Sequence, residues 1–100
     1  MSYANPIYPA VYTVTIAGGS TVDDNQIVFP GTAVYIQITN ESDSQDLMLQ
    51  LNSLTDLMTL PKNTTQIFNH GDMQLQAISF DNTPSGSSDV DVQIVVGYTK

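Results

Sequence analysis

The feature that most constrains this chain is a short-range alternation of apolar and polar residues that recurs along its length. In AVYIQITN, residues 33–40, the aliphatic residues Val34, Ile36 and Ile38 alternate with Tyr35, Gln37 and Thr39. Successive side chains of a strand point to opposite faces, so this pattern predicts a strand with one face in a core. Gly, Pro, Asn, Asp and Ser cluster between such runs and indicate turns. The chain is therefore predicted to be all-β.

Seven or eight short strands follow from this pattern. The predicted strands span residues 10–17, 26–29, 33–40, 46–52, 54–60, 64–69, 73–80 and 90–98. The segment 54–60 fits a strand or one irregular turn, and Pro30-Gly31 ends the second strand. A change of parity within 73–80 predicts a β-bulge near Ala77. Strands spaced by about 8–12 residues indicate an antiparallel β-sandwich, Ig-like or jelly-roll-like.

One domain is expected, because 100 residues suffice for a modest core and no linker divides the chain. We assign residues 10–100 to this domain and residues 1–9 to an extended N-terminal arm. The core is predicted to be aliphatic and to contain Val14, Ile36, Ile38, Leu47, Leu49, Leu51, Leu75, Val92 and Ile94.

The N-terminal arm, MSYANPIYP, is apolar and aromatic but contains Pro6 and Pro9. Proline lacks the backbone N–H that a strand ladder needs, so a regular strand is not expected here. Tyr3, Ile7 and Tyr8 are therefore expected to pack on a surface, either that of their own subunit or that of a neighbour. If the surface is that of a neighbour, the arm residues that bind this partner are Tyr3, Pro6, Ile7, Tyr8 and Pro9.

Charge excludes several classes of function. Ten acidic residues face only Lys62 and Lys100, which gives a formal net charge of −8. Nucleic-acid binding needs many lysines or arginines to replace phosphate counterions, and anionic membranes would repel this chain.

No apolar run approaches the ~20 residues of a membrane span. The N-terminus also lacks the basic and apolar regions of a signal peptide.

The predicted outward faces are neutral rather than charged. They carry amides and hydroxyls, namely Gln37, Thr39, Gln50, Gln66, Gln74, Gln76 and Gln93. Monomeric β-proteins usually guard their strand edges with lysine or inward-pointing charge, and this chain does not. We interpret the faces and edges as covered by other subunits, with Val95 and Tyr98 as candidate interface residues. The alternative is that net negative charge alone keeps a monomer soluble.

No motif in the sequence predicts catalysis or a cofactor. His70 is the only histidine and lies in the turn NHGD, which favours a turn role over a Ser-His-Asp triad. The absence of cysteine excludes thiolate metal sites and a blue-copper centre. Pairs of loop aspartates leave calcium as an alternative to ordinary turn capping, which we favour. These pairs are Asp23 with Asp24, Asp43 with Asp46, and Asp81 with Asp89.

The stretch PGTAVYIQITNESDSQDLMLQL, followed by LPKNTTQIF and DVDVQIVVGY, resembles small β-sandwich accessory proteins of tailed-phage virions. The likeness covers residues 30–98, with Lys62-Asn63 where the family has smaller residues. It implies a non-enzymatic decoration or cement subunit on the capsid surface, or else a tail or fibre component. It also implies a homo-oligomer, commonly a trimer, whose terminal arms contact the major capsid protein or another virion protein.

A carbohydrate-binding β-sandwich module is the rival interpretation. Such modules stack sugars on exposed aromatic side chains, and Tyr35 with Tyr98 could form such a platform. The chain contains no tryptophan, which counts against this function.

Overall fold

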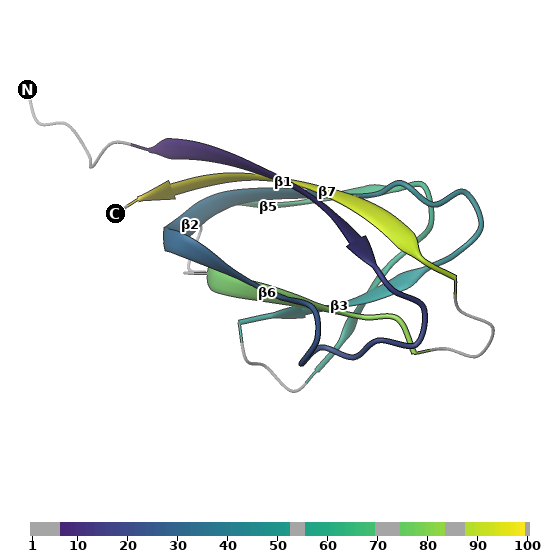
Figure 1. The fold of residues 1–100 in the computed structure, drawn as a ribbon. Coiled ribbons are helices and arrows are strands. Elements are labelled where there is room, and N and C mark those ends of the chain that lie inside the picture. The colour runs from purple at the N-terminus through teal and green to yellow at the C-terminus, as the bar shows by residue number, and fades with distance from the viewer. Residues whose placement is uncertain (1–6, 53–55, 70–74, 84–87, 100) are drawn as a thin grey trace, which may run out of the picture.

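The computed structural model describes residues 7–52, 56–69, 75–83 and 88–99, which form seven strands (Figure 1). The strands are β1 (Tyr8–Ile16), β2 (Gln26–Asn40), β3 (Leu47–Leu51), β4 (Met58–Leu60), β5 (Thr65–Asn69), β6 (Leu75–Asp81) and β7 (Val90–Thr99). Every strand pair is antiparallel. The predicted all-β antiparallel fold is confirmed.

The seven strands belong to one hydrogen-bonded sheet in the order β1-β7-β2-β6-β3-β4, and β5 also pairs with β2. The first part of β2 pairs with β6, whereas its second part pairs with β7 and β5. β2 therefore passes through both layers that Figure 1 shows, an upper layer with β1, β7 and β5 and a lower layer with β6 and β3. The sheet folds over on itself around one core, and the layers are not two separate sheets.

The prediction that a strand ends at Pro30-Gly31 is wrong, because β2 continues through both residues. The pairing of β2 with β6 shifts register between Val28 and Ala33, so the residues between them lie outside that ladder. Proline is tolerated there because its missing donor is not needed, and glycine permits close backbone approach. The two residues mark the bend between layers.

The bulge predicted near Ala77 lies on the partner strand. Ala77 pairs with Val28 and Leu75 pairs with Ala33, so five steps along β2 correspond to two along β6. The extra residues belong to β2, while β6 keeps a constant register with β3 from Ile78 to Asp81. The change of parity in the sequence has a counterpart in burial, because Leu75, Ile78 and Phe80 all belong to the core although Leu75 has the other parity.

The predicted core is buried except for Val14, which is half-buried because β1 is an edge strand. β1 begins at Tyr8 rather than at residue 10, and β4 occupies only the last part of the segment 54–60. The largest buried side chain is Phe80, on β6. His70 and Asp72 lie outside the described residues.

Candidate interaction surface

The described part of the predicted arm packs on its own subunit. The side chain of Ile7 lies over Gly97 of β7, where an added Cβ would be 3.0 Å from Ile7 Cγ2. The rings of Tyr8 and Tyr98 lie 5.7 Å apart, and Pro9 pairs with Gly97 inside the β1–β7 ladder. Tyr3 and Pro6 lie outside the described residues. Tyr8 and Pro9 are therefore strand residues, although the sequence places them in the arm.

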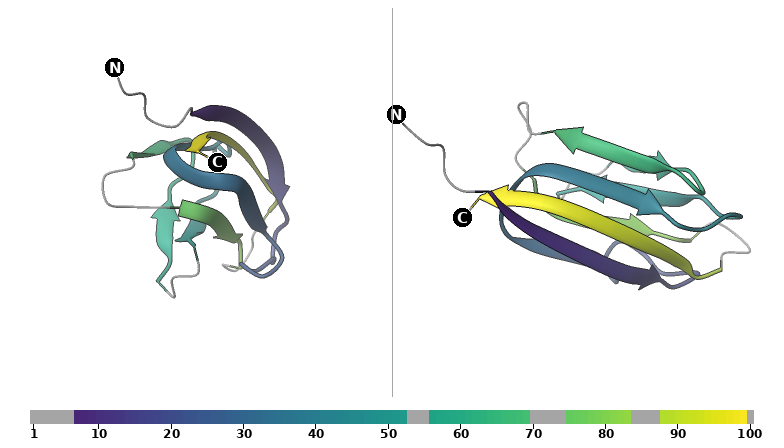
Figure 2. Two further views of the ribbon diagram at one scale, coloured as in Figure 1. Left: turned by 90° about the vertical axis from the view of Figure 1, so that its left-hand side faces the viewer. Right: turned by 90° about the horizontal axis from the view of Figure 1, so that it is seen from above.

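The upper layer presents a four-stranded outer face, in which β1, β7, β2 and β5 lie side by side (Figure 2, right). Cross-strand pairing aligns Val11 of β1 with Val95 of β7, then with Gln37 of β2 and Ile67 of β5. Val11 is 62% exposed and Ile67 is 54% exposed, whereas Val95 between them is half-buried. The predicted interface residue Val95 thus lies inside an exposed aliphatic row.

A second row of the outer face is made of hydroxyls and an amide. It runs from Thr13 through Gln93 and Thr39 to Thr65, and the hydroxyls of Thr39 and Thr65 are 2.9 Å apart. We define the outer face as Pro9, Val11, Thr13, Tyr35, Gln37, Thr39, Thr65, Ile67, Gln93 and Val95, none of which is charged. The next row on this side of the layer, Thr15 with Asp91, carries a carboxylate and bounds the outer face.

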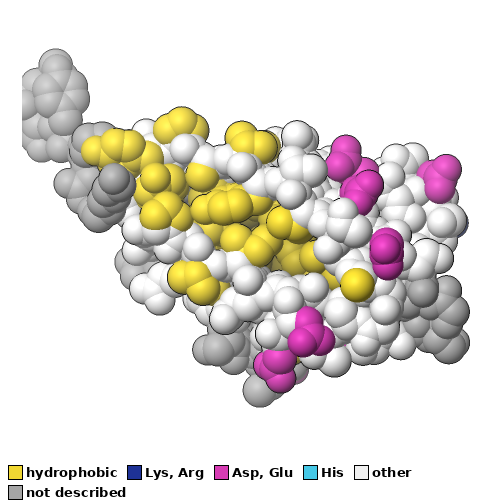
Figure 3. Space-filling view, viewed as in Figure 1, with side chains coloured by type: hydrophobic (Ala, Val, Ile, Leu, Met, Phe, Trp, Pro, Cys, Tyr) yellow, Lys and Arg dark blue, Asp and Glu magenta, His cyan; other side chains and the backbone are white. Residues whose placement is uncertain are grey.

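Acidic side chains gather at the loop end of the molecule, away from the Tyr8 end (Figure 3). Their hydrogen bonds tie loops and strand ends. Asp91 accepts a bond from Thr15 Oγ1 at 2.7 Å, and Asp89 accepts one from the Gly18 amide at 3.0 Å. Asp46 accepts one from the Lys62 amide at 2.8 Å. The outer face therefore ends where these acids begin, at the row of Thr15 and Asp91.

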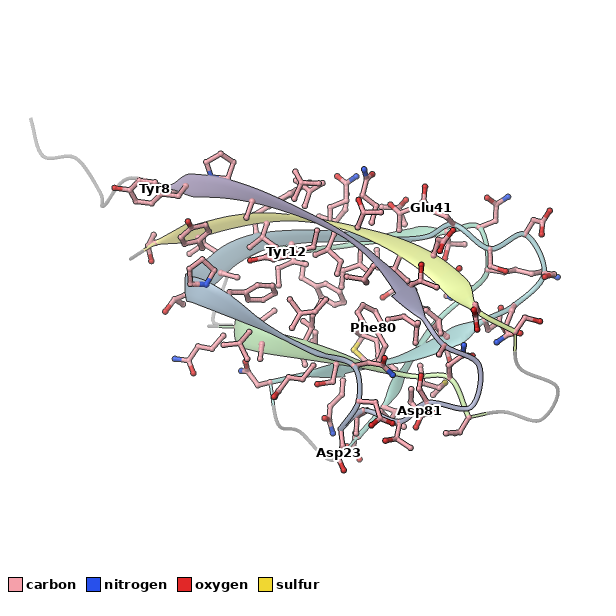
Figure 4. All side chains as sticks on the ribbon, viewed as in Figure 1. Tyr8, Tyr12, Asp23, Glu41, Phe80 and Asp81 are labelled. Carbon is pink, nitrogen blue, oxygen red and sulfur yellow. The ribbon has the colours of Figure 1, made fainter. Side chains whose placement is uncertain are left out.

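Between β1 and the first part of β2 the molecule is open, and apolar side chains show through (Figure 3). Tyr12, Val14 and Ile27 are partly buried against the core at this opening. The ring of Tyr12 lies 6.2 Å from that of Phe29, and Figure 4 shows Tyr12 directed from β1 toward the lower layer.

A cleft of about 210 Å³ lies between residues 14–16 of β1 and residues 24–27. It is smaller than the ~300–1,000 Å³ typical of small-molecule sites. Asp24 is the one ionisable side chain in its lining.

Metal-ligating side chains do not cluster among the described residues. No three histidine or acidic side chains among them gather as metal ligands. Two of the aspartates of the calcium alternative, Asp24 and Asp81, cap turns, whereas Asp46 and Asp89 accept bonds from amides of other loops. Asp81 accepts from the Thr83 amide and hydroxyl, and Asp24 from the Thr21 amide. No described helix is long and apolar enough to cross a membrane.

Tyr35 and Tyr98 do not form one aromatic platform. Tyr35 lies on the outer face, opposite Gly97, and its hydroxyl donates to Gln37 Oε1 at 3.0 Å. Tyr98 has the parity of the buried β7 residues and packs against the core. The two rings therefore belong to opposite sides of the upper layer, contrary to the joint platform of the carbohydrate interpretation.

Sequence reasoning missed two apolar members of the outer face, Val11 and Ile67. It also placed Gln66 on an outward face, which is wrong, because Gln66 pairs with the inward Ile38 and donates through Nε2 to the Thr59 carbonyl. Val11 could have been found, because it alternates with the inward residues Tyr12 and Val14 of the predicted strand. Ile67 carries no such signal, since its place beside Gln37 depends on the pairing of β5 with β2.

Neither a known protein family, nor a curated protein, nor a solved structure matches this chain.

Proposed function

We propose that this protein is a non-enzymatic structural subunit that works through protein–protein contacts of its outer face. The setting we propose is a tailed-phage virion, where the protein decorates and stabilises the capsid surface as a homo-oligomer bound to the major capsid protein. The virion setting depends on the resemblance of residues 30–98 to virion accessory proteins. The tail or fibre remains the alternative location.

The observation that carries the proposal is the uncharged, partly apolar outer face on a chain of net charge −8. Interface cores are depleted in charged residues, and apolar groups that project from a neutral surface serve as contacts. Val11 and Ile67 project from this face, while the carboxylates lie toward the other end of the molecule. Contact through the face thus requires no charge to be desolvated.

The test is binding to capsid shells assembled without the protein. Wild-type protein should sediment with the shells saturably, whereas Val11→Lys/Ile67→Lys should lose at least about tenfold in affinity, because lysine is costly to bury at a contact. The matched control is Ser44→Lys/Gln76→Lys. It adds the same charge at an exposed loop position and at an exposed β6 position, and it should bind as wild type does.

Equal binding by wild type and the face variant would contradict the role of the outer face. Absence of wild-type binding to shells and to tails would contradict the virion setting. Saturable binding to a glycan array, lost in Tyr35→Ala, would instead favour the carbohydrate-binding function.

A further inference from the structure

We propose that β1 pairs edge to edge with β1 of a second copy around a two-fold axis. Its central pair is Thr13 with Thr13 of the second copy. The inference deepens the proposed function by naming one partner, and it rests on that proposal in treating the chain as a subunit of an assembly. It joins the upper layers of two copies into one continuous sheet.

The ladder geometry fixes which backbone groups of β1 are free to pair. The Glu41 amide donates to the Asp91 carbonyl at 3.0 Å, so Asp91 and the β7 residues of the same parity hydrogen-bond toward β2. Residues of the other parity, such as Val92, therefore bond toward β1, where Val92 pairs with Val14. In an antiparallel ladder, a residue directs its N–H and C=O to the same side.

The remaining β1 residues direct their backbone groups away from β7. These are Pro9, Val11, Thr13 and Thr15, which pair with β7 residues that bond toward β2. The position of Pro9 agrees with this assignment, since a proline has no donor to contribute to a ladder. No described strand pairs with this edge, which is one end of the sheet. Val11, Thr13 and Thr15 thus present donors and acceptors.

One register of self-pairing uses all three donor-bearing residues. It places Thr13 opposite Thr13 of the second copy and Val11 opposite Thr15 of the second copy, and each such pair exchanges two hydrogen bonds. Pro9 then falls opposite Ala17, beyond the end of β1. Shifting the copies so that the axis moves toward Pro9 would place Pro9 within the ladder and lose a donor on each side.

The same register covers the apolar opening of the molecule. Tyr12 falls opposite Val14 of the second copy, in a non-hydrogen-bonded pair where side chains approach closely. Both residues are only partly buried in the single chain and lie at the opening between β1 and β2. Self-pairing therefore satisfies backbone groups and buries apolar surface at one contact.

The distribution of charge along β1 allows a second copy to be the occupant. Asp89 and Asp91 lie near the end of β1, and residues 7–16 carry no charge. Because the pairing is antiparallel, the acids of one copy face the acid-free start of β1 in the other. Unguarded edges of this kind are templates for pairing.

The other edges are less suited to this role. Among the described strands, β5 pairs with β2 alone, but its free edge is five residues long against nine in β1. β4 has three residues, is flanked by Asp56 and Lys62, and has its Thr59 carbonyl bonded by Gln66 Nε2 of β5 at 3.0 Å. The start of β2 adjoins Asp23 and Asp24.

Single cysteines test the register, because the chain has no cysteine of its own. Thr13→Cys should form a covalent dimer under mild oxidation, since paired Cα atoms lie about 5.5 Å apart, within disulfide range. Val11→Cys alone should not, because its counterpart would be four residues along the strand, about 13 Å away. Val11→Cys mixed with Thr15→Cys should give the mixed dimer.

Light scattering of the full chain tests the dimer itself. Wild type should have twice the mass of one chain, and Thr13→Lys should weaken association at least tenfold, because it places like charges opposite each other. Gln93→Lys, one strand away from the edge, should stay dimeric.

A monomeric wild type would overturn the inference, as would a trimer indifferent to Thr13→Lys or equal cross-linking at residues 11 and 13. Failure of the dimer is distinguishable from failure of the proposed function, because self-association is measured without shells.

Discussion

Asn82 joins three loops at the acidic end of the molecule and is fully buried. Its Nδ2 donates to the carbonyls of Ile16 at 3.1 Å and Ser88 at 2.8 Å, and its Oδ1 accepts from Gln45 Nε2. Its backbone also bonds Ser20 and Gly19. One amide side chain therefore joins the end of β1, the end of β6 and the segment just before β7.

Asn82→Ala should destabilise the fold by about 2–4 kcal/mol, because it leaves buried carbonyls and the Gln45 amide without their partner. Urea unfolding at equilibrium measures the change. Thr83→Ala, at the adjacent exposed position, should change stability by less than about 1 kcal/mol. Equal effects of both substitutions would contradict the structural role of Asn82.

The sequence gives no indication of this role. DNTPSGSS has the composition of a solvated loop, and asparagine is an ordinary turn residue there. Asn82 is buried only because Ile16 and Gln45, both distant in sequence, come to the same end of the sheet. By contrast, the buried parity of Leu47, Leu49 and Leu51 follows from local alternation and could be predicted.

At the scale of elements, the bend of β2 brings the upper and lower layers together. Gly31 lies at this bend against the end of β7, where an added Cβ would lie 2.0 Å from the Thr99 carbonyl oxygen. That neighbour is backbone, which cannot rotate away as a side chain does.

Gly31→Ala should therefore lower stability by about 1–3 kcal/mol, the usual cost of overpacking. The melting temperature should fall by about 4–8 °C for each kcal/mol in a domain of this size. Gly97→Ala is the control, because its added Cβ meets the flexible Ile7 side chain at 3.0 Å. A larger loss for Gly97→Ala than for Gly31→Ala would contradict this account of the bend.

The strands were predictable where alternation was local, but their neighbours were not. Residues 35–40 show their inward and outward faces directly. At the preceding residues the pairing with β7 shifts register, so that Ala33 is buried in the core in place of the predicted Val34. The proline at position 30 has the same local signature whether a strand ends or bends, and only the shifted pairing with β6 decides between them. The outer face follows from strand order, so Val11 and Ile67 could not be placed in one row beforehand.

At the scale of the whole molecule, the distribution of charge separates an acidic loop end from an uncharged sheet edge and face. The net charge of −8 was evident from composition, and so was the lack of lysine on the strands. Where the acids lie relative to the β1 edge follows only from the fold. This separation lets two like-charged copies meet without bringing carboxylates together.

Added salt should strengthen self-association, because each copy carries a net charge of −8 and the proposed contact contains no ion pair. The screening length falls from about 30 Å at 0.01 M to about 8 Å at 0.15 M, so long-range repulsion fades while the strand pairing is unaffected. Sedimentation equilibrium should show an association constant that rises about tenfold or more across this range.

Asp43→Asn/Asp56→Asn removes two negative charges at exposed loop positions, which changes the net charge from −8 to −6, and it should flatten this dependence on salt. A contact held by ion pairs would weaken with salt, and that result would contradict a dimer formed through the β1 edge.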